Sequence, residues 1–258
     1  MADPRPIGVF DSGVGGLSVV VEIRKVLPHE IILYYADTLH CPYGPRPADE
    51  VRQLAMEASA YLLGQGSKLI VVACNTASSV ALSALRAGFD VPFVGMVPAV
   101  KPASLATRAR KVLVMATTAT FQAQVFSDLV GQFANGIQVH TQACPELVDL
   151  VECGEADLGR IEPLLSHYLE PVSAHGLDTV VLGCTHFVFL RKEIQRIVGD
   201  AVRVIDTGEA VARQVQRVLE ERGLAAPPGP QGSVALLCSG DREKFLAAAR
   251  RLIGDWVS

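Results

Sequence analysis

Short apolar runs alternate with longer segments of helical periodicity along most of the chain. The apolar runs predict strands at 7–10, 31–36, 69–73, 91–95, 111–116, 137–143, 179–183, 201–206 and 234–238. Apolar residues at helical spacing predict helices at 15–27, 48–63 and 76–86, and helices fill most of the remaining gaps. Near-continuous apolar strands separated by helices are typical of an α/β protein whose parallel sheet is covered on both faces.

The order of these segments is repeated. Three segments of the first half have counterparts in the second: "IGVFDSG" and "VLVMATT", "IILYYAD" and "IQVHTQA", and "VVACNT" and "VVLGCT". Matches in the same order predict two similar lobes related by pseudo-two-fold symmetry, each with a mainly parallel sheet. We expect lobe 1 to comprise 1–97 plus 209–258 and lobe 2 to comprise 98–208. Ligands bind at the carboxyl ends of parallel strands, so an active site is expected in the cleft between the lobes.

Composition narrows the function classes. Half of the residues are hydrophobic, which allows a sizeable core, and the formal net charge is −4. No block of lysine and arginine indicates binding to nucleic acid or to an anionic membrane. No apolar run reaches transmembrane length, and "MADPRPIGVF" lacks the pattern of a secretory signal. We therefore expect a cytoplasmic protein.

Two of the cysteines stand at strand ends. The cysteines are Cys41, Cys74, Cys144, Cys153, Cys184 and Cys238. None is spaced C-x-x-C, and a reducing cytosol disfavours a disulfide framework, so a small buried hydrophobe is the ordinary interpretation of each. Cys74 and Cys184 both end apolar strands and precede a helix start, where the helix dipole favours thiolate. His186 lies two residues after Cys184 and could take part in its proton transfers.

Two polar loops follow the first two strands. "FDSGVGG", Phe10 to Gly16, has neither the Walker A pattern nor the dinucleotide-binding glycine spacing. It is either a tight turn in which Asp11 or Ser12 caps the next helix, or a carboxylate-binding turn with Asp11 facing the site. "CPYGPR", from Cys41 to Arg46, is a shaped turn that is either a ligand-binding loop or simply a stiff one.

Two facing thiols could invert a stereocentre, since one removes a proton from carbon while the other donates one to the opposite face. The α-proton of an amino acid is weakly acidic, and enzymes usually recruit pyridoxal phosphate through a lysine to remove it. The lysines are Lys25, Lys68, Lys101, Lys111, Lys192 and Lys244. None falls at the end of a predicted strand, which favours a route without a cofactor.

"FDSGVGGLSV", "CPYG", "VVACNTAS" and "LGCTH", in this order, resemble the glutamate racemases of the aspartate/glutamate racemase superfamily. "ACPELVDLVECGE" and "SGDREKF" fit the same pattern, so the resemblance spans Ile7 to about Leu252. It implies interconversion of L- and D-glutamate without pyridoxal phosphate or metal, and supply of D-glutamate for bacterial peptidoglycan. It also implies a homodimer.

The resemblance assigns roles at the α-carbon. Cys74 would remove the α-proton of D-glutamate and Cys184 that of L-glutamate, each supplying the returning proton in the other direction. Asp11 would assist on the Cys74 side and His186 beside Cys184. The further acidic residues linked to the site are Asp37 and Glu152.

Substrate contacts are also implied by the resemblance. They carry over to Asp11, Ser12, Tyr43, Gly44, Asn75, Thr76, Thr185 and His186. Thr117, Thr118 and Thr120, in "ATTATF", would add hydroxyl or amide donors to a carboxylate. Val188 stands where the family commonly has proline, and we expect altered packing beside His186. With little sequence ahead of Ile7, activation through an N-terminal extension is not expected.

Three other functions remain open from the residues. Cys184 with His186 could be a nucleophile for acyl transfer, although this leaves Cys74 without a role. Aspartate racemase or a related isomerase would use the same cysteine pair on a shorter substrate. A two-lobed amino-acid-binding protein would need no thiols.

Overall fold

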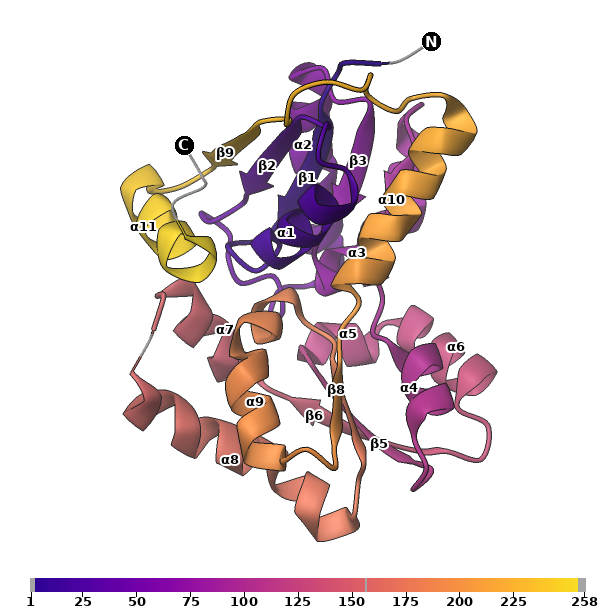
Figure 1. Ribbon diagram of the computed structural model, residues 1–258, viewed down its shortest axis with the longest axis vertical. Helices are drawn as coiled ribbons and strands as arrows, with labels where there is room; N and C mark the ends of the chain where they lie inside the picture. Colours follow the sequence, from indigo (N-terminus) through magenta and orange to yellow (C-terminus); the bar gives the residue numbers. More distant parts are fainter. Residues whose placement is uncertain (1–2, 156, 255–258) are drawn as a thin grey trace.

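The computed structural model describes residues 3–155 and 157–254, which form two parallel β-sheets flanked by helices (Figure 1). The first sheet and its helices occupy the upper half of Figure 1, and the second sheet and its helices the lower half. Among the described residues, no helix is long and apolar enough to cross a membrane. The predicted α/β class with two sheet-based halves is therefore confirmed.

The first sheet has the strand order β4-β3-β1-β2-β9, and all neighbouring strands run parallel. Its strands are β1 Ile7–Asp11, β2 Ile32–Ala36, β3 Leu69–Val72, β4 Phe93–Val94 and β9 Val234–Cys238. Its helices are α1 Leu17–Val26, α2 Ala48–Gly64, α3 Asn75–Gly88, α10 Gly208–Arg222 and α11 Arg242–Ile253. Helix α1 packs against α10 and α11, whereas α2 packs against α3.

The second sheet has the order β6-β5-β7-β8, again with all strands parallel. Its strands are β5 Lys111–Ala116, β6 Gln138–Ala143, β7 Thr179–Leu182 and β8 Arg203–Ile205. The surrounding α-helices are α4 Val100–Ala106, α5 Thr118–Gln122, α6 Gln124–Phe133, α7 Pro145–Glu152, α8 Leu158–His175 and α9 Arg191–Val198. A short 3₁₀ helix, η1 Thr185–Leu190, follows β7.

The two sheets repeat one topology. If β5, β6, β7 and β8 are matched to β1, β2, β3 and β4, both sheets have the same spatial order, and β9 is an addition to the first. The matched strands are those that carry the repeated sequence segments, so the predicted internal repeat is confirmed. It places the ends of β3 and β7, with the cysteines that follow them, at equivalent points of the two sheets.

One of three apolar core clusters among the described residues joins the halves. The central strands β1, β3 and β7 are buried throughout, because helices cover both faces of parallel sheets, whereas the edge strand β6 is partly exposed. A single apolar cluster contains Leu17 and Val71 from the first half together with Met115 and Leu182 from the second. The chain passes between the sheets after β4 and again after β8. The lobe boundaries at 97/98 and 208/209 stay a prediction.

Candidate active site

Both strand-end cysteines are buried at helix starts. Cys74 is the N-cap residue of α3, and its Sγ accepts a hydrogen bond from the Ala77 N–H at 3.5 Å. Cys184 is the N-cap residue of η1, which is a 3₁₀ helix of 6 residues and not an α-helix. The cysteines are only 6% and 7% exposed, respectively. Equivalent strands therefore deliver two thiols, but the helices that follow differ in length and type.

The Cys184 side carries a chain of acid–base groups. The Nδ1 atom of His186 lies 3.6 Å from Cys184 Sγ, and its Nε2 atom lies 2.5 Å from Oε1 of Glu152, the last residue of α7. Burial by itself lowers the pKa of His186, but hydrogen bonds with Cys184, Cys41 and Glu152 outweigh it and raise that pKa well above its ordinary value. Burial by itself raises the pKa of Glu152, but the bond to His186 and its charge lower it. The imidazole and the carboxyl group therefore form an ion pair, and positive charge faces Cys184.

The Cys74 side is dominated by burial. Burial raises the pKa of the Cys74 thiol well above its usual range, and negative charges on Asp11 and Cys184 add to the rise. The Ala77 N–H at the helix start opposes this shift, as the sequence predicts, but does not overcome it. Cys74 therefore rests as a thiol.

Asp11 lies between the halves. Its carboxylate accepts hydrogen bonds from the Thr185 hydroxyl at 2.9 Å and from the Ser12 hydroxyl at 3.0 Å and N–H at 2.5 Å. Burial raises the pKa of Asp11, whereas the charge of His186 and the Thr185 hydroxyl lower it. Asp11 is fully buried and belongs to the first half, so Thr185 links it to the end of β7. Proton-carrying groups of both sheets thus share one hydrogen-bonded region.

The glycine-rich turn after β1 receives side chains from the second half. Helix α1 begins at Leu17 with Gly16 as N-cap and no side-chain cap, so capping by Asp11 or Ser12 is wrong. A Cβ on Gly13 would lie 1.8 Å from Glu152 Oε1. A Cβ on Gly15 would lie 2.4 Å from His186 Nδ1.

The backbone of the same turn binds a carboxylate of the protein itself, because the Val14 N–H donates to Glu152 Oε1 at 2.8 Å. The glycines therefore allow side chains of the other half to approach this turn closely, and binding of a substrate carboxylate by the turn stays a prediction.

Tyr43 is fixed by Asp37. The Tyr43 hydroxyl donates to Asp37 Oδ2 at 2.7 Å, and Ser239 after β9 donates to the other oxygen at 2.7 Å. Both Asp37 and Tyr43 are buried. A Cβ on Gly44 would meet the Thr117 side chain at 3.1 Å, so this loop of the first half lies directly on the second. The "CPYG" segment therefore contributes positioned groups at the junction.

A chain of hydroxyls joins the halves beside α3. Thr76 Oγ1 lies 2.9 Å from Thr117 Oγ1, which in turn lies 2.9 Å from Thr120 Oγ1. All three are buried, whereas the Thr118 side chain is exposed. The structure therefore brings together Thr76, Thr117 and Thr120 and leaves Thr118 outside this chain.

Asn75 is the unsatisfied polar group of the site. Its side chain is 3% exposed, and neither its amide nitrogen nor its oxygen has a hydrogen-bond partner within the described residues. A buried amide without partners costs free energy, which a ligand with complementary charges recovers. Asn75 directly follows Cys74, so such a ligand would lie beside the thiol.

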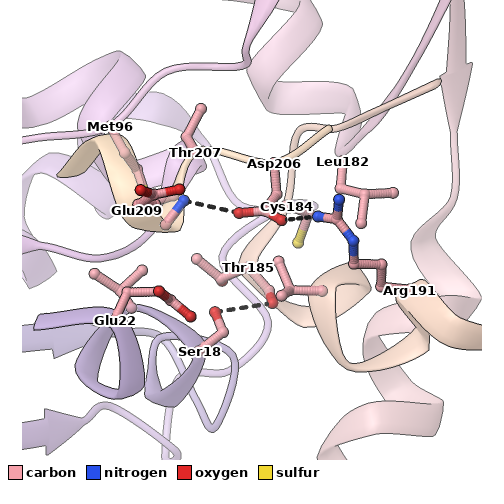
Figure 2. Close-up of a pocket in the computed structure, with 13 residues that line it drawn as sticks. Ser18, Glu22, Met96, Leu182, Cys184, Thr185, Arg191, Asp206, Thr207 and Glu209 are labelled. Atoms are coloured by element: carbon pink, nitrogen blue, oxygen red, sulfur yellow. Dashed lines mark hydrogen bonds and ion pairs between the residues drawn. The ribbon is translucent and has the colours of Figure 1, made fainter. Parts of the chain in front are cut away.

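A cavity of about 390 Å³ adjoins the Cys184 side between the halves. It is lined by residues that include Cys184, Thr185 and Val188, the residue that stands where the family commonly has proline. Figure 2 shows Ser18 of α1 donating to the Thr185 carbonyl at 3.3 Å, and Arg191 paired with Asp206 after β8. The cavity thus meets the site at η1.

Two groups near the site were not predicted from the sequence. Cys41 lies beside His186 and Glu152, and one N, O or S atom of each side chain lies within 4.8 Å of the other two. Asp206 binds Arg191 and the Gly208 N–H at the cavity. Both follow parallel strands, so the strand-end rule that selected Cys74 could have selected them, but no residue pattern distinguished them from ordinary loop residues.

Comparison with known proteins agrees with this geometry. The family model for Asp/Glu/hydantoin racemases matches residues 18–215. The chain is 48% identical over 241 residues to the glutamate racemase of Herpetosiphon aurantiacus, covering 93% of this chain and 95% of the relative. It is 46% identical over 251 residues to the glutamate racemase of Ectopseudomonas mendocina, covering 97% of this chain and 95% of the relative.

Solved structures of glutamate racemases share the fold. An isoform from Bacillus anthracis matches with a TM-score of 0.88 at 32% identity, over 98% of this chain and 96% of that one. The Escherichia coli enzyme, in complex with L-glutamate and the activator UDP-MurNAc-ala, matches with a TM-score of 0.83 at 36% identity, over 96% of each chain. The Francisella tularensis enzyme, in complex with D-glutamate, matches with a TM-score of 0.84 at 27% identity, over 98% of this chain and 95% of that one. The chain therefore belongs to the Asp/Glu/hydantoin racemase family.

Proposed function

We propose that this protein is a glutamate racemase that interconverts L- and D-glutamate by proton transfer at the α-carbon, without pyridoxal phosphate or metal. The observation that carries the proposal is the pair of buried thiols, Cys74 and Cys184, at equivalent strand ends of two sheets. Cys184 has His186 as an acid–base neighbour at 3.6 Å, and the charge of Asp11 acts on Cys74. The relatives at 46–48% identity are glutamate racemases, which favours glutamate over aspartate as substrate.

With L-glutamate as substrate, Cys184 acts as the base and Cys74 as the acid. The His186 imidazolium, 3.6 Å from Cys184 Sγ, stabilises negative charge on that sulfur, whereas burial keeps Cys74 protonated. Cys184 thiolate takes the α-proton, and the C–H electron pair stays on the substrate as a carbanion. The Cys74 S–H then gives its proton to the opposite face of that carbon. The product is D-glutamate, with Cys184 protonated and Cys74 as thiolate, the form that accepts D-glutamate in the reverse reaction.

The substrate's own charges match the groups around the thiols. Glutamate carries two carboxylates and one ammonium group. The Asn75 amide and the hydroxyls of Ser12, Thr76 and Thr117 can bind carboxylate oxygens, and Asp11 can hold the ammonium group. We include Tyr43, Gly44, Thr120 and Thr185 as neighbouring contacts and leave Thr118, whose side chain is exposed, as the weakest assignment.

Burial supports chemistry at an unactivated carbon. Asp11, Asn75, Thr185 and His186 are each at most 3% exposed. Fixed dipoles in a site that excludes water stabilise developing charge more strongly than water does, because they need no reorganisation during the reaction. Thiols suit the proton transfers, since their ordinary pKa near neutrality lets one group act as acid and as base.

The same proposal covers the cellular role. We infer that the enzyme supplies D-glutamate for peptidoglycan, acts in the cytoplasm and forms a homodimer. Sedimentation or light scattering of the purified protein tests the dimer separately from the chemistry.

One assay tests the reaction. The purified protein is incubated with L-glutamate in D₂O without added pyridoxal phosphate or metal, and the α-proton is followed by NMR together with optical rotation. We expect loss of the α-proton signal and of optical rotation together. Absence of both would refute the racemase. Parallel incubation with L-aspartate identifies the side-chain preference, and release of an acid from an ester substrate with retained rotation would favour the acyl-transfer alternative instead.

A further inference from the structure

The thiol of Cys41 lies beside the His186–Glu152 pair without a role in the proposed proton transfers. Cys41 belongs to the loop after β2, Glu152 ends α7, and His186 lies in η1. One ligand atom from each of the three side chains lies within 4.8 Å of the others. Among the described residues, this is the group of cysteine, histidine and acidic side chains that could hold a metal ion.

The three side chains offer the kinds of ligand atom that bind zinc in proteins. Thiolate, imidazole and carboxylate bind Zn²⁺ at about 2.0–2.3 Å in tetrahedral sites, so ligand atoms lie about 3.3–3.8 Å apart. The Nε2 atom of His186 and Oε1 of Glu152, now 2.5 Å apart, would separate, and Cys41 would close in by about 1 Å. These are side-chain rotations, and three protein ligands leave one tetrahedral position open.

An ion can reach the cluster from the surface. Glu152 and Val14 line a cavity of about 270 Å³ between the loop after β2 and the start of α11. The Glu152 side chain is 19% exposed, whereas that of His186 is 3% exposed. Glu152 therefore connects solvent with the buried imidazole, on the side of His186 opposite to Cys184.

We propose that Cys41, Glu152 and His186 form a zinc-binding site through which Zn²⁺ inhibits the enzyme. Binding would release two protons to solvent, one from the Cys41 thiol and one from the His186 imidazolium, and leave thiolate and neutral imidazole on the metal. The binding clause stands on the geometry alone. The inhibition clause rests on the proposed function.

Inhibition is expected because a bound metal would replace the hydrogen bond between His186 and Glu152. In the structure the two ring nitrogens of His186 connect Glu152 to Cys184. A metal on one nitrogen replaces the bond to Glu152 and holds the ring in place. The ring then no longer connects Glu152 with Cys184, so proton transfer at that sulfur slows.

The binding test uses Co²⁺ as a spectroscopic substitute for zinc. Thiolate ligation gives a near-ultraviolet charge-transfer band, which we expect in the wild-type protein and expect to disappear in Cys41→Ser. Cys153→Ser is the matched control, because Cys153 is an exposed thiol next to Glu152 at the end of α7. A band retained in Cys41→Ser and lost in Cys153→Ser would overturn the site, and a circular dichroism spectrum verifies that each variant is folded.

The inhibition test measures racemisation with and without Zn²⁺, and each variant is compared with its own metal-free rate. We expect reversal by EDTA in the wild type and at least about a tenfold higher inhibitory concentration in Cys41→Ser, the cost of weakening a metal site. Cys153→Ser should match the wild type. Equal inhibition in all three proteins would overturn the proposal, since zinc would then act directly on Cys74 or Cys184.

The two arms also separate this proposal from the proposed function. A cobalt band that depends on Cys41, in a protein without racemase activity, would refute the racemase and retain the metal site. Racemisation without a cobalt band that depends on Cys41 would retain the racemase and refute the metal site, and racemisation that is insensitive to Zn²⁺ would refute the inhibition. A Cys41→Ala variant repeats both arms if the serine variant does not fold.

Discussion

The two halves place a cysteine at the same point of the same topology and surround it differently. Asn75 and Thr76 follow Cys74, and Thr185 and His186 follow Cys184. Asn75 has no partner within the described residues, whereas Thr185 donates to Asp11. Thr76 joins a chain of hydroxyls, whereas His186 pairs with Glu152. One half thus offers groups for a ligand and the other offers groups that move a proton.

This difference explains how a symmetric fold can remove a proton at one face of a carbon and donate a proton at the other face. A mirrored reaction needs an acid on one side and a base on the other in the same turnover. Burial holds Cys74 in the acid form, while the imidazolium of His186 lies 3.6 Å from Cys184 Sγ, where it can stabilise negative charge during proton transfer. Identical surroundings would give both thiols the same protonation state, and neither direction would have a poised pair.

The largest effect should come from removing either sulfur. Cys74→Ser and Cys184→Ser are each expected to lower the rate of racemisation by roughly 10²- to 10⁴-fold, the contribution of a positioned acid or base. A serine hydroxyl is far less acidic than a thiol and cannot exchange the proton near neutrality. Optical rotation of both enantiomers measures the loss, with Cys153→Ser as control. A variant with full two-way activity would refute the use of two bases.

Asn75 should matter to the substrate and not to the fold. Asn75→Leu keeps the size of the side chain and removes an unpartnered amide, so we expect unchanged or higher thermal stability. Loss of a hydrogen bond to a charged substrate should lower kcat/KM by roughly 10- to 100-fold. The matched variant in the other half is Thr185→Val, which removes a bond to Asp11 and should lower stability. If Asn75→Leu lowers stability and leaves KM unchanged, Asn75 is structural.

The directional assignment can be tested through kcat. Glu152→Gln should weaken the charge of His186 and lower kcat from L- to D-glutamate by about tenfold, the effect of one pKa unit. Asp11→Asn should instead affect kcat from D- to L-glutamate more. L- and D-glutamate have equal free energies, so the equilibrium constant between them is one. Because the ratio of kcat/KM in the two directions equals that constant, each variant must lower kcat/KM by the same factor in both directions. Equal changes of kcat in both directions for both variants would contradict the division of roles.

The smallest effect concerns stability against pH. Because the pKa of His186 is raised, its contribution to the free energy of unfolding is complete below its ordinary pKa of 6.5 and is lost as pH rises through the raised pKa. Because the pKa of Glu152 is lowered, its contribution to the free energy of unfolding is present above its ordinary pKa of 4.5 and is lost as pH falls through the lowered pKa. The groups facing this pair are Cys41, Cys184 and Asp11.

Wild type should therefore exceed Glu152→Gln in stability most clearly between about pH 4.5 and pH 6.5, by about 1–3 kcal/mol. That difference corresponds to about 2–4 °C in Tm for each kcal/mol in a protein of this size. Thermal melts across pH measure it. A difference that grows steadily into the alkaline range would contradict the ion pair.

The sequence by itself determined the elements, the repeated topology and the strand ends that carry chemistry. Strand and helix periods are local properties, and parallel strands place their carboxyl ends at one edge of a sheet, so Cys74, Cys184 and Asp11 could be selected from the pattern. The family motifs added Glu152 and Tyr43, which no spacing argument singles out.

Only the tertiary structure decided what these groups contact and in which state they rest. The Val14 N–H binds Glu152 across a separation of 138 residues, and the glycines of this turn allow that close approach. Cys41 reaches His186 and Glu152 for the same reason, because both lie in the other half. Protonation was equally hidden, since the helix start favours thiolate at Cys74 and burial outweighs it. Burial and contacts between distant segments arise when the chain folds, and no local pattern records them.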